Sequence, residues 1–217
     1  MRNSFLSFTL SLASGLVVGV FGPLLEASGN PVGHVASVVL VAGWMYALLA
    51  FGAGWTARSK VGAALRAWAV LVVAVVSYYV TKAVLGDFRV PDFNDPANRA
   101  VVFGWNEFLS KIEGWCVFAA VLGPLCGLAG YLSRTGSGPR RPLLLLPPRL
   151  LVPAVAVAET TMQLAYESDT GPDAPVVCAV WTVTRALAAA VALVVAGTAL
   201  VADLNSRSAS ARPHHLD

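Results

Sequence analysis

Long apolar runs constrain this chain more than any other feature of its sequence. The run Phe5–Leu25 contains no charged residue, and Val176–Ala202 contains only Arg185. Over the whole chain 57% of the residues are hydrophobic and only 12% are charged, whereas roughly 25% of residues are charged in soluble domains. So few polar side chains could not cover a water-facing surface. Because backbone polar groups in lipid must be satisfied within the protein, the runs predict an all-α, polytopic membrane bundle.

We predict six transmembrane helices in a single domain over residues 1–204. The predicted spans are about 5–25, 35–57, 65–85, 112–132, 150–166 and 176–202. The remaining stretch, 205–217, is rich in Ser and Arg and is expected to form a disordered cytoplasmic tail.

The longest predicted loop lies between the third and fourth spans. Asp95-Pro96 fits the start of a helix, and the apolar spacing behind it predicts a short interfacial helix over 96–110. Trp105 would then lie at headgroup depth. The alternative is that this stretch simply lengthens the fourth span.

The positions of the basic residues predict the orientation of the bundle. A six-span arrangement places ten of the fifteen Lys and Arg residues on one side, and most of the acidic loop residues on the other. The ten are Arg2, Arg58, Lys60, Arg66, Arg134, Arg140, Arg141, Arg149, Arg207 and Arg212. Because cytoplasmic loops are enriched in basic residues, we expect both termini on the cytoplasmic side of the membrane.

Two glycine pairs have the spacing of close helix contacts. Gly15 and Gly19, and Gly123 and Gly127, are each four residues apart, which lets a neighbouring backbone approach. Packing within one bundle is favoured over a dimer interface, and the oligomeric state is left open.

Two ionisable residues, Glu159 and Arg185, lie well inside predicted spans. A charged side chain at mid-membrane costs about 2.5–3.5 kcal/mol on insertion scales. In an antiparallel hairpin of the last two spans, a rise of 1.5 Å per residue puts the two at depths that differ by about 6 Å. This predicts a buried ion pair, which could lock the hairpin or form part of a functional site.

Polar and aromatic residues predict a pocket in the outer half of the bundle. The aromatic candidates for its wall are Trp44, Tyr46, Tyr78, Tyr79, Trp115, Phe118 and Trp181. The candidate acids are Glu159, Glu113 and Glu26, and the supporting polar residues are Arg185, Gln163, Lys82 and His34. The alternatives are an interfacial belt and core packing for the aromatic residues, and solvated loop ends for Glu26 and His34.

The motifs for several chemistries are missing from the sequence. It has no phosphate-cradling glycine loop, zinc-ligand spacing or nucleophile elbow. His214-His215 lies in the tail, and Asp92 with Asp95 is a weak signal for a metal-bound diphosphate. We therefore expect no metal, no other cofactor and no nucleic-acid partner.

Several short motifs resemble a known group of proteins. They are Gly33-His34-Val35-Ala36, Gly43-Trp44, Ser77-Tyr78-Tyr79, Gly123-Pro124 and Ala158-Glu159. They resemble those of a family of uncharacterised actinobacterial multi-pass membrane proteins, with a departure at Ser37, where an Asn is expected. In size, helix count and buried carboxylates among aromatic residues, the chain is also similar to the small integral-membrane terpene cyclases of bacterial and fungal meroterpenoid pathways.

The second resemblance implies an enzyme for an apolar isoprenoid, which could be a prenylated aromatic compound. A carboxylic acid would protonate the chain, and aromatic ring faces would stabilise the cation that forms. Glu159 is the first candidate for the acid, but a tight pair with Arg185 would shift that role to Glu113 or Glu26. The alternative is a transport or binding protein for a small solute or lipid headgroup, built around Glu159 and Arg185.

Overall fold

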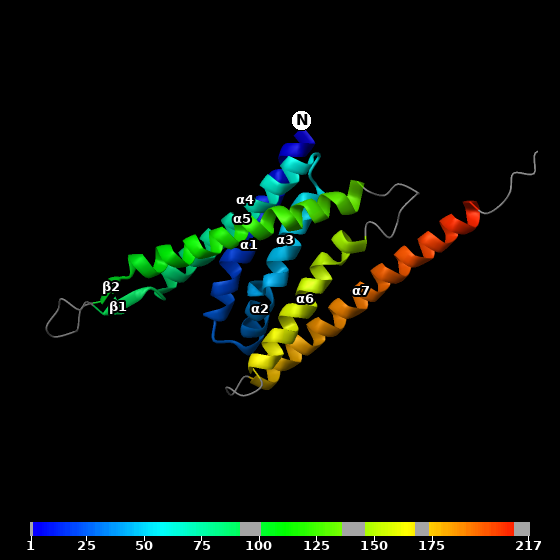
Figure 1. Cartoon of the computed structure of the whole chain (residues 1–217). Coiled ribbons are helices and arrows are strands. Elements are labelled where there is room, and N and C mark those ends of the chain that lie inside the picture. Colours follow the sequence, from blue (N-terminus) through cyan, green and yellow to red (C-terminus); the bar gives the residue numbers. More distant parts are fainter. Residues whose placement is uncertain (1, 92–100, 136–145, 168–173, 211–217) are drawn as a thin grey trace, which may run out of the picture.

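The computed structural model describes residues 2–91, 101–135, 146–167 and 174–210 (Figure 1). These residues form seven helices and one short β-hairpin. The elements are α1 (Arg2–Glu26), α2 (Pro31–Val41), α3 (Gly43–Trp55), α4 (Lys60–Leu85), β1 (Arg89–Pro91), β2 (Val101–Phe103), α5 (Trp105–Thr135), α6 (Leu146–Glu167) and α7 (Ala174–Ser210). The predicted all-α class is confirmed.

Four of the described helices, α1, α4, α5 and α7, are long and apolar enough to cross a membrane. The consecutive helices α2 and α3 qualify as a fifth span when taken together, with a bend of 54° between them. Helix α6 does not reach the same apolar content, because Glu159 and the polar residues that follow it interrupt its second half. The described residues thus contain four to five candidate membrane-spanning helices, and the sixth predicted span is not among them.

Small residues hold the helices of the bundle close together. Helix α4 packs extensively against α1 and α5, and α3 lies against both α4 and α5. A Cβ atom on Gly15 of α1 would come within 2.6 Å of the Val70 carbonyl oxygen of α4, and one on Gly127 of α5 within 2.6 Å of the Ala63 oxygen. The prediction that the glycine pairs pack within one bundle is confirmed.

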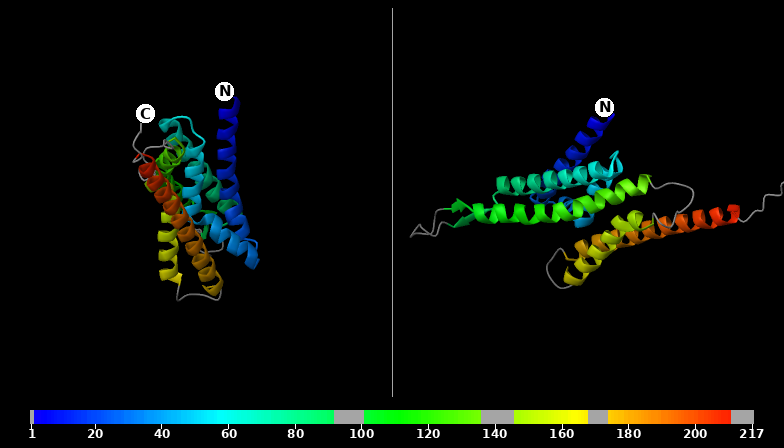
Figure 2. Two further views of the ribbon diagram at one scale, coloured as in Figure 1. Left: turned by 90° about the vertical axis from the view of Figure 1, so that its right-hand side faces the viewer. Right: turned by 45° about the horizontal axis from the view of Figure 1, so that its top comes forward.

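The α6–α7 hairpin lies on one side of this group of helices (Figure 2). Helix α6 packs on α3 and α5, whereas α7 packs mainly on α6 and makes a smaller contact with α2. In the apolar 18-residue stretch of each single-helix candidate, 28–39% of the residues are buried in α1, α4 and α5 but only 6% in α7.

Local caps stabilise several helix ends in the bundle, but the start of α3 has none. Asn30 accepts a hydrogen bond from Val32 N–H at the start of α2, and Ser59 accepts one from Gly62 N–H at the start of α4. Gly86, with φ of 99°, ends α4 in the left-handed conformation that favours glycine. Helix α3 begins after Ala42, whose side chain makes no capping hydrogen bond.

Three predicted boundaries are corrected by the structure. The predicted span 35–57 is two helices, because the backbone leaves the helical conformation at Ala42 (ψ 140°). The predicted interfacial helix 96–110 is replaced by β2 and by the start of α5, which runs without a break from Trp105 and so lengthens the fourth span. Helix α7 continues to Ser210, into the stretch predicted as a tail. Residues 92–100 and 211–217 lie outside the described residues.

The N-terminus lies at the same end of the bundle as the α3–α4 turn, which contains Arg58 and is followed by Lys60 (Figure 1). Arg134 at the end of α5 donates to the Ala57 carbonyl, and Arg149 of α6 donates to the Ser133 carbonyl at 3.3 Å. Lys82 lies at the opposite end of α4. The end-to-end sorting of charge in the sequence therefore corresponds to a sorting in space.

Candidate functional site

The break between α2 and α3 is bridged by a side chain from α6. The Gly43 N–H donates to Oε1 of Glu159 and the Trp44 N–H donates to Oε2, each across 2.7 Å. These amides belong to the first turn of α3, where helix geometry leaves N–H groups without partners and where the helix dipole favours a negative charge. Glu159 thus supplies the cap that the local sequence of α3 lacks.

The predicted ion pair between Glu159 and Arg185 is wrong. Lys82 forms ion pairs with Glu26 and Asp87, but Glu159 and Arg185, both within the described residues, form none with each other. Both carboxylate oxygens of Glu159 are directed at α3, so the side chain points away from α7. Arg185 is half-buried on α7 and does not line the cavity described next.

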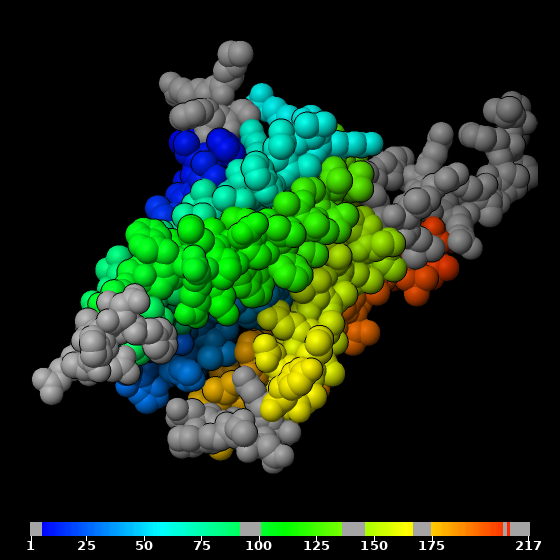
Figure 3. All heavy atoms as spheres, turned by 60° about the vertical axis from the view of Figure 1, so that its left-hand side comes forward, coloured from blue at the N-terminus to red at the C-terminus, as the bar shows by residue number. Residues whose placement is uncertain are grey.

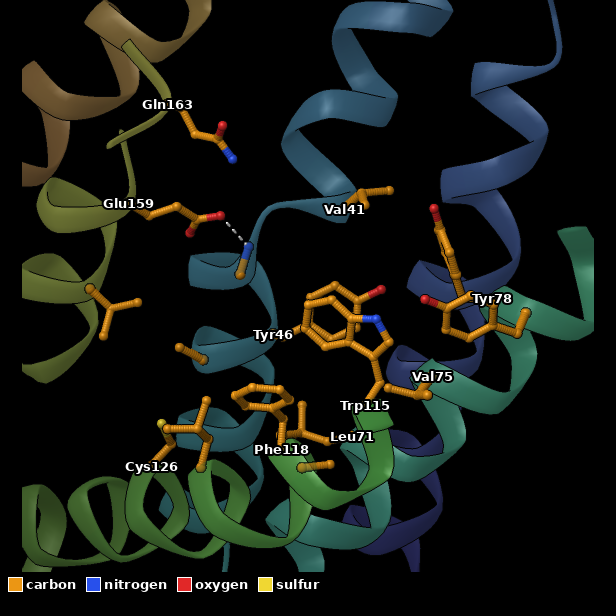
Figure 4. A pocket seen from close by; sticks show the side chains of 16 residues that line it. Val41, Tyr46, Leu71, Val75, Tyr78, Trp115, Phe118, Cys126, Glu159 and Gln163 are labelled. Atoms are coloured by element: carbon orange, nitrogen blue, oxygen red, sulfur yellow. Dashed lines mark hydrogen bonds between the residues drawn. The ribbon is translucent and has the colours of Figure 1, made fainter. Parts of the chain in front are cut away.

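A cavity of about 390 Å³ lies between α3, α4, α5 and α6, with Glu159 at one end (Figure 4). Its wall is mainly aromatic and aliphatic. It is lined by Val41, Gly43, Tyr46, Ala47, Leu71, Val75, Tyr78, Tyr79, Trp115, Phe118, Ala119, Leu122, Cys126, Val155, Glu159 and Gln163. Small-molecule sites in proteins typically occupy roughly 300–1,000 Å³ and have an apolar wall with a few polar groups. This cavity has both features.

The aromatic residues of the cavity come from three helices. Tyr46 projects from α3, Tyr78 and Tyr79 from α4, and Trp115 and Phe118 from α5. The Tyr78 and Tyr79 rings meet edge to face at 5.2 Å, and the Trp115 and Phe118 rings lie 5.6 Å apart. The structure therefore brings these five predicted residues together, along with Glu159 and Gln163.

The cavity is open on the side of α5. Trp115, Phe118 and Leu122 line it yet remain 53%, 60% and 50% exposed. In Figure 3 α5 (green) and α6 (yellow) diverge across this face, and atoms of the α2–α3 segment (blue) show between them. A molecule outside the bundle can thus reach the cavity between α5 and α6.

Trp44 and Trp181, also predicted for the wall, lie elsewhere. Trp181 is buried against Ala42 and Val177 in a cluster where α2, α6 and α7 meet, and Trp44 packs on its edge. The indole N–H of Trp44 is buried and has no hydrogen-bond partner among the described residues. Its backbone N–H, not its ring, takes part in the site.

The other predicted polar residues lie outside the cavity. The Lys82 cluster, defined here as Lys82, Glu26 and Asp87, has Nζ 3.4 Å from Glu26 Oε2 and 2.9 Å from Asp87 Oδ2. Glu113 is exposed on α5, and His34 lies half-buried in the first turns of α2. Of the three candidate acids, only Glu159 lines the cavity.

Several lining residues were not predicted. Ala47, Ala119 and Cys126 belong to the small, buried core between α3, α4 and α5, and nothing in their sequence context distinguishes them from other core positions. The backbone amides of Gly43 and Trp44 were also missed, although a glycine inside an apolar run is a signal for an interrupted helix.

Comparison with models of protein families, with curated proteins and with solved structures found no match to this chain. The function is therefore argued from the cavity itself.

Proposed function

We propose that this protein binds a largely apolar small molecule, taken up from the surrounding lipid, in the aromatic cavity between α3, α4, α5 and α6. The observation that carries the proposal is the cavity of about 390 Å³, with five aromatic side chains on its wall and a carboxylate at one end. Its α5 wall is exposed at Trp115 and Phe118. On a membrane-spanning helix such exposed residues face lipid, so a lipid-soluble ligand needs no aqueous path.

The membrane arrangement belongs to the same proposal. We propose six crossings, with α2–α3 as one bent span and α6 as another, in a bacterial cytoplasmic membrane. The basic residues at the end of the bundle that holds the N-terminus favour that end as the cytoplasmic one. Helix α6 can be tolerated in lipid because Glu159, its interior charged residue, is hydrogen-bonded to α3.

A narrower candidate is cyclisation of an isoprenoid chain, in which case the ligand is a substrate. In that reaction an acid adds a proton to an alkene, a second alkene attacks the cation, and a proton is finally lost, so the product is an isomer of the substrate. The ring faces of Tyr46, Tyr78 and Trp115 favour this candidate, because aromatic faces stabilise cations. The proton donor for this reaction is less well supported. The oxygens of Glu159 already accept two N–H groups, and the other candidate acids lie outside the cavity.

The alternative of a solute site built from Glu159 together with Arg185 loses its basis, because the two residues do not pair. Binding of a lipid-soluble molecule at Glu159 alone keeps its support.

Photocrosslinking from α5 tests the binding proposal. A benzophenone amino acid would replace Phe118, which lines the cavity, or Val117, which does not; the two positions are equally exposed, at 60% each. After expression in a bacterial membrane and irradiation, mass spectrometry of the purified protein would identify the attached molecules.

We expect a discrete adduct at position 118 and only bulk phospholipid at position 117. The same phospholipid adducts at both positions would contradict the binding proposal. Purified protein that leaves isoprenoid substrates unchanged, while still giving the discrete adduct at position 118, would remove cyclisation and leave binding.

A further inference from the structure

The lining of the cavity carries charge of one sign only. Glu159 is its one acidic residue, and none of its sixteen residues is Lys, Arg or His. In surroundings as apolar as these, charge–charge interactions are stronger than in water, because the effective dielectric constant is lower. A ligand that carries a positive charge is therefore favoured over an anion of the same size.

The carboxylate of Glu159 can still accept hydrogen bonds from a ligand. A carboxylate has about four acceptor positions on its two oxygens, and the amides of α3 use one on each oxygen. Figure 4 shows Glu159 and Gln163 entering from α6 on the same side of the cavity, with Tyr46 and Trp115 facing them across it. Gln163 adds an amide that can donate or accept. The amides of α3 thus hold the carboxylate in a fixed position beside an open space.

The aromatic residues extend the preference for a positively charged ligand along the cavity. The faces of Tyr46, Tyr78, Trp115 and Phe118 present negative π density, and several such faces around one space are the usual protein solution for binding a quaternary ammonium group. Their rings also bury the apolar body that such a ligand needs in order to dissolve in lipid.

Lys82, a basic residue beside the cavity wall, does not reverse the negative charge of this region. Lys82 has its Nζ 5.7 Å from the centre of the Tyr78 ring. It also lies within ion-pair distance of two carboxylates, those of Glu26 and Asp87. The Lys82 cluster therefore carries a net negative charge, and it attracts cations toward this end of the bundle.

We propose that the ligand of the cavity is a lipophilic cation: an ammonium or phosphonium centre on an apolar body, with the charge held by Glu159 and the surrounding rings. This rests on the proposed binding function and adds the charge of the ligand to it. A polar solute cation and an anionic lipid are both disfavoured, the first by the apolar wall and the second by the carboxylate.

Three probes of similar shape and different charge test the proposal. They are tetraphenylphosphonium, the anion tetraphenylborate and neutral triphenylphosphine oxide, each measured by equilibrium dialysis against the full chain in phosphatidylcholine nanodiscs. Empty nanodiscs correct for partitioning into lipid. We expect saturable binding of the phosphonium at least about tenfold tighter than that of the phosphine oxide, and no saturable binding of the borate.

Two substitutions in the cavity and one control assign the effect to the site. Glu159→Gln should weaken phosphonium binding about tenfold or more. Because that change also disturbs the start of α3, Gln163→Glu provides an independent test: it adds a second carboxylate without touching the cap and should tighten phosphonium binding by about threefold or more. Glu113→Gln removes an exposed carboxylate outside the cavity and should leave binding of all probes unchanged.

The outcomes separate the two proposals. If the phosphine oxide binds saturably and as tightly as the phosphonium, and Gln163→Glu has no effect, the preference for a cation is wrong and the binding function stands. If none of the three probes binds saturably but position 118 still gives its discrete adduct, the preference for a cation is wrong and the binding function stands; if that adduct is missing as well, both proposals fail.

Discussion

The hydrogen bonds from α3 to Glu159 make a prediction that can be tested without knowing the ligand. In Glu159→Gln, one oxygen can still accept an N–H, but the NH₂ group meets the second N–H as donor against donor. In Glu159→Ala, both amides lose their acceptor. A hydrogen bond to a charged group contributes about 1.5–3 kcal/mol, and an unsatisfied buried donor costs about 1–3 kcal/mol. We therefore expect a destabilisation of about 1.5–3 kcal/mol for Gln and roughly 3–6 kcal/mol for Ala.

Two measurements would detect this loss. A loss of 1 kcal/mol lowers the unfolding temperature of a chain of this size by about 2–4 °C. In detergent, the unfolding temperature should therefore fall by about 3–12 °C in Glu159→Gln and further in Glu159→Ala. Hydrogen exchange is the more specific readout, because the lost bonds belong to Gly43 and Trp44. A peptide that covers these two amides should exchange about tenfold faster or more in both variants, while peptides from the centre of α4 should not change.

Glu113→Gln is the matched control, since it removes the same charge from an exposed site on α5. Its exchange and its unfolding temperature should equal those of the unmodified protein. If the Gly43–Trp44 peptide exchanges at the same rate in both Glu159 variants as in the unmodified protein, Glu159 does not cap α3 and the reasoning is refuted.

Three further predictions concern packing, charge and topology. Gly127→Ala places a methyl group against the backbone of α4 and should destabilise the protein by about 1–3 kcal/mol. The control is Gly197→Ala, where a Cβ meets nothing within 4 Å, and it should be neutral or stabilise α7 by up to about 1 kcal/mol. Equal unfolding temperatures of the two variants would contradict the close approach of α4 and α5. Lys82→Ala leaves the carboxylates of Glu26 and Asp87 without their shared cation and should lower the unfolding temperature by about 1–4 °C. High salt should reduce this difference, and a difference that does not depend on salt would contradict the prediction. In a chain whose native cysteines are replaced, a membrane-impermeant maleimide added to intact cells should label Ser28→Cys and not Ser59→Cys; the reverse result would invert the proposed topology.

The helices were predictable from the sequence because each apolar run is long and carries few charges. The runs also revealed the depth of each residue in the bundle. This is why the sequence assigns Tyr46, Tyr78 and Trp115 to one pocket: all three are expected in the outer half of the bundle, and the structure places them around one cavity.

The rotation of each helix about its axis was not predictable, and the errors follow from it. Residues two apart on a helix point in different directions, so Trp44 packs toward α2 and α7 while Tyr46 faces the cavity. The same uncertainty explains the wrong ion pair. Glu159 and Arg185 were predicted at similar depths, but α6 is rotated so that Glu159 faces α3.

The role of Glu159 in the fold changes what a charged residue in the proposed span α6 implies. A charged residue at mid-membrane costs about 2.5–3.5 kcal/mol, a penalty that is usually taken as a sign of function. Here the two N–H bonds from Gly43 and Trp44 can contribute a similar amount, at about 1.5–3 kcal/mol each. They also provide partners for amides that the break at Ala42 would otherwise leave unpaired. The half-buried position of this carboxylate is thus explained by structure alone. The feature that points to function is instead the open, aromatic cavity between α3, α4, α5 and α6, with Glu159 at one end.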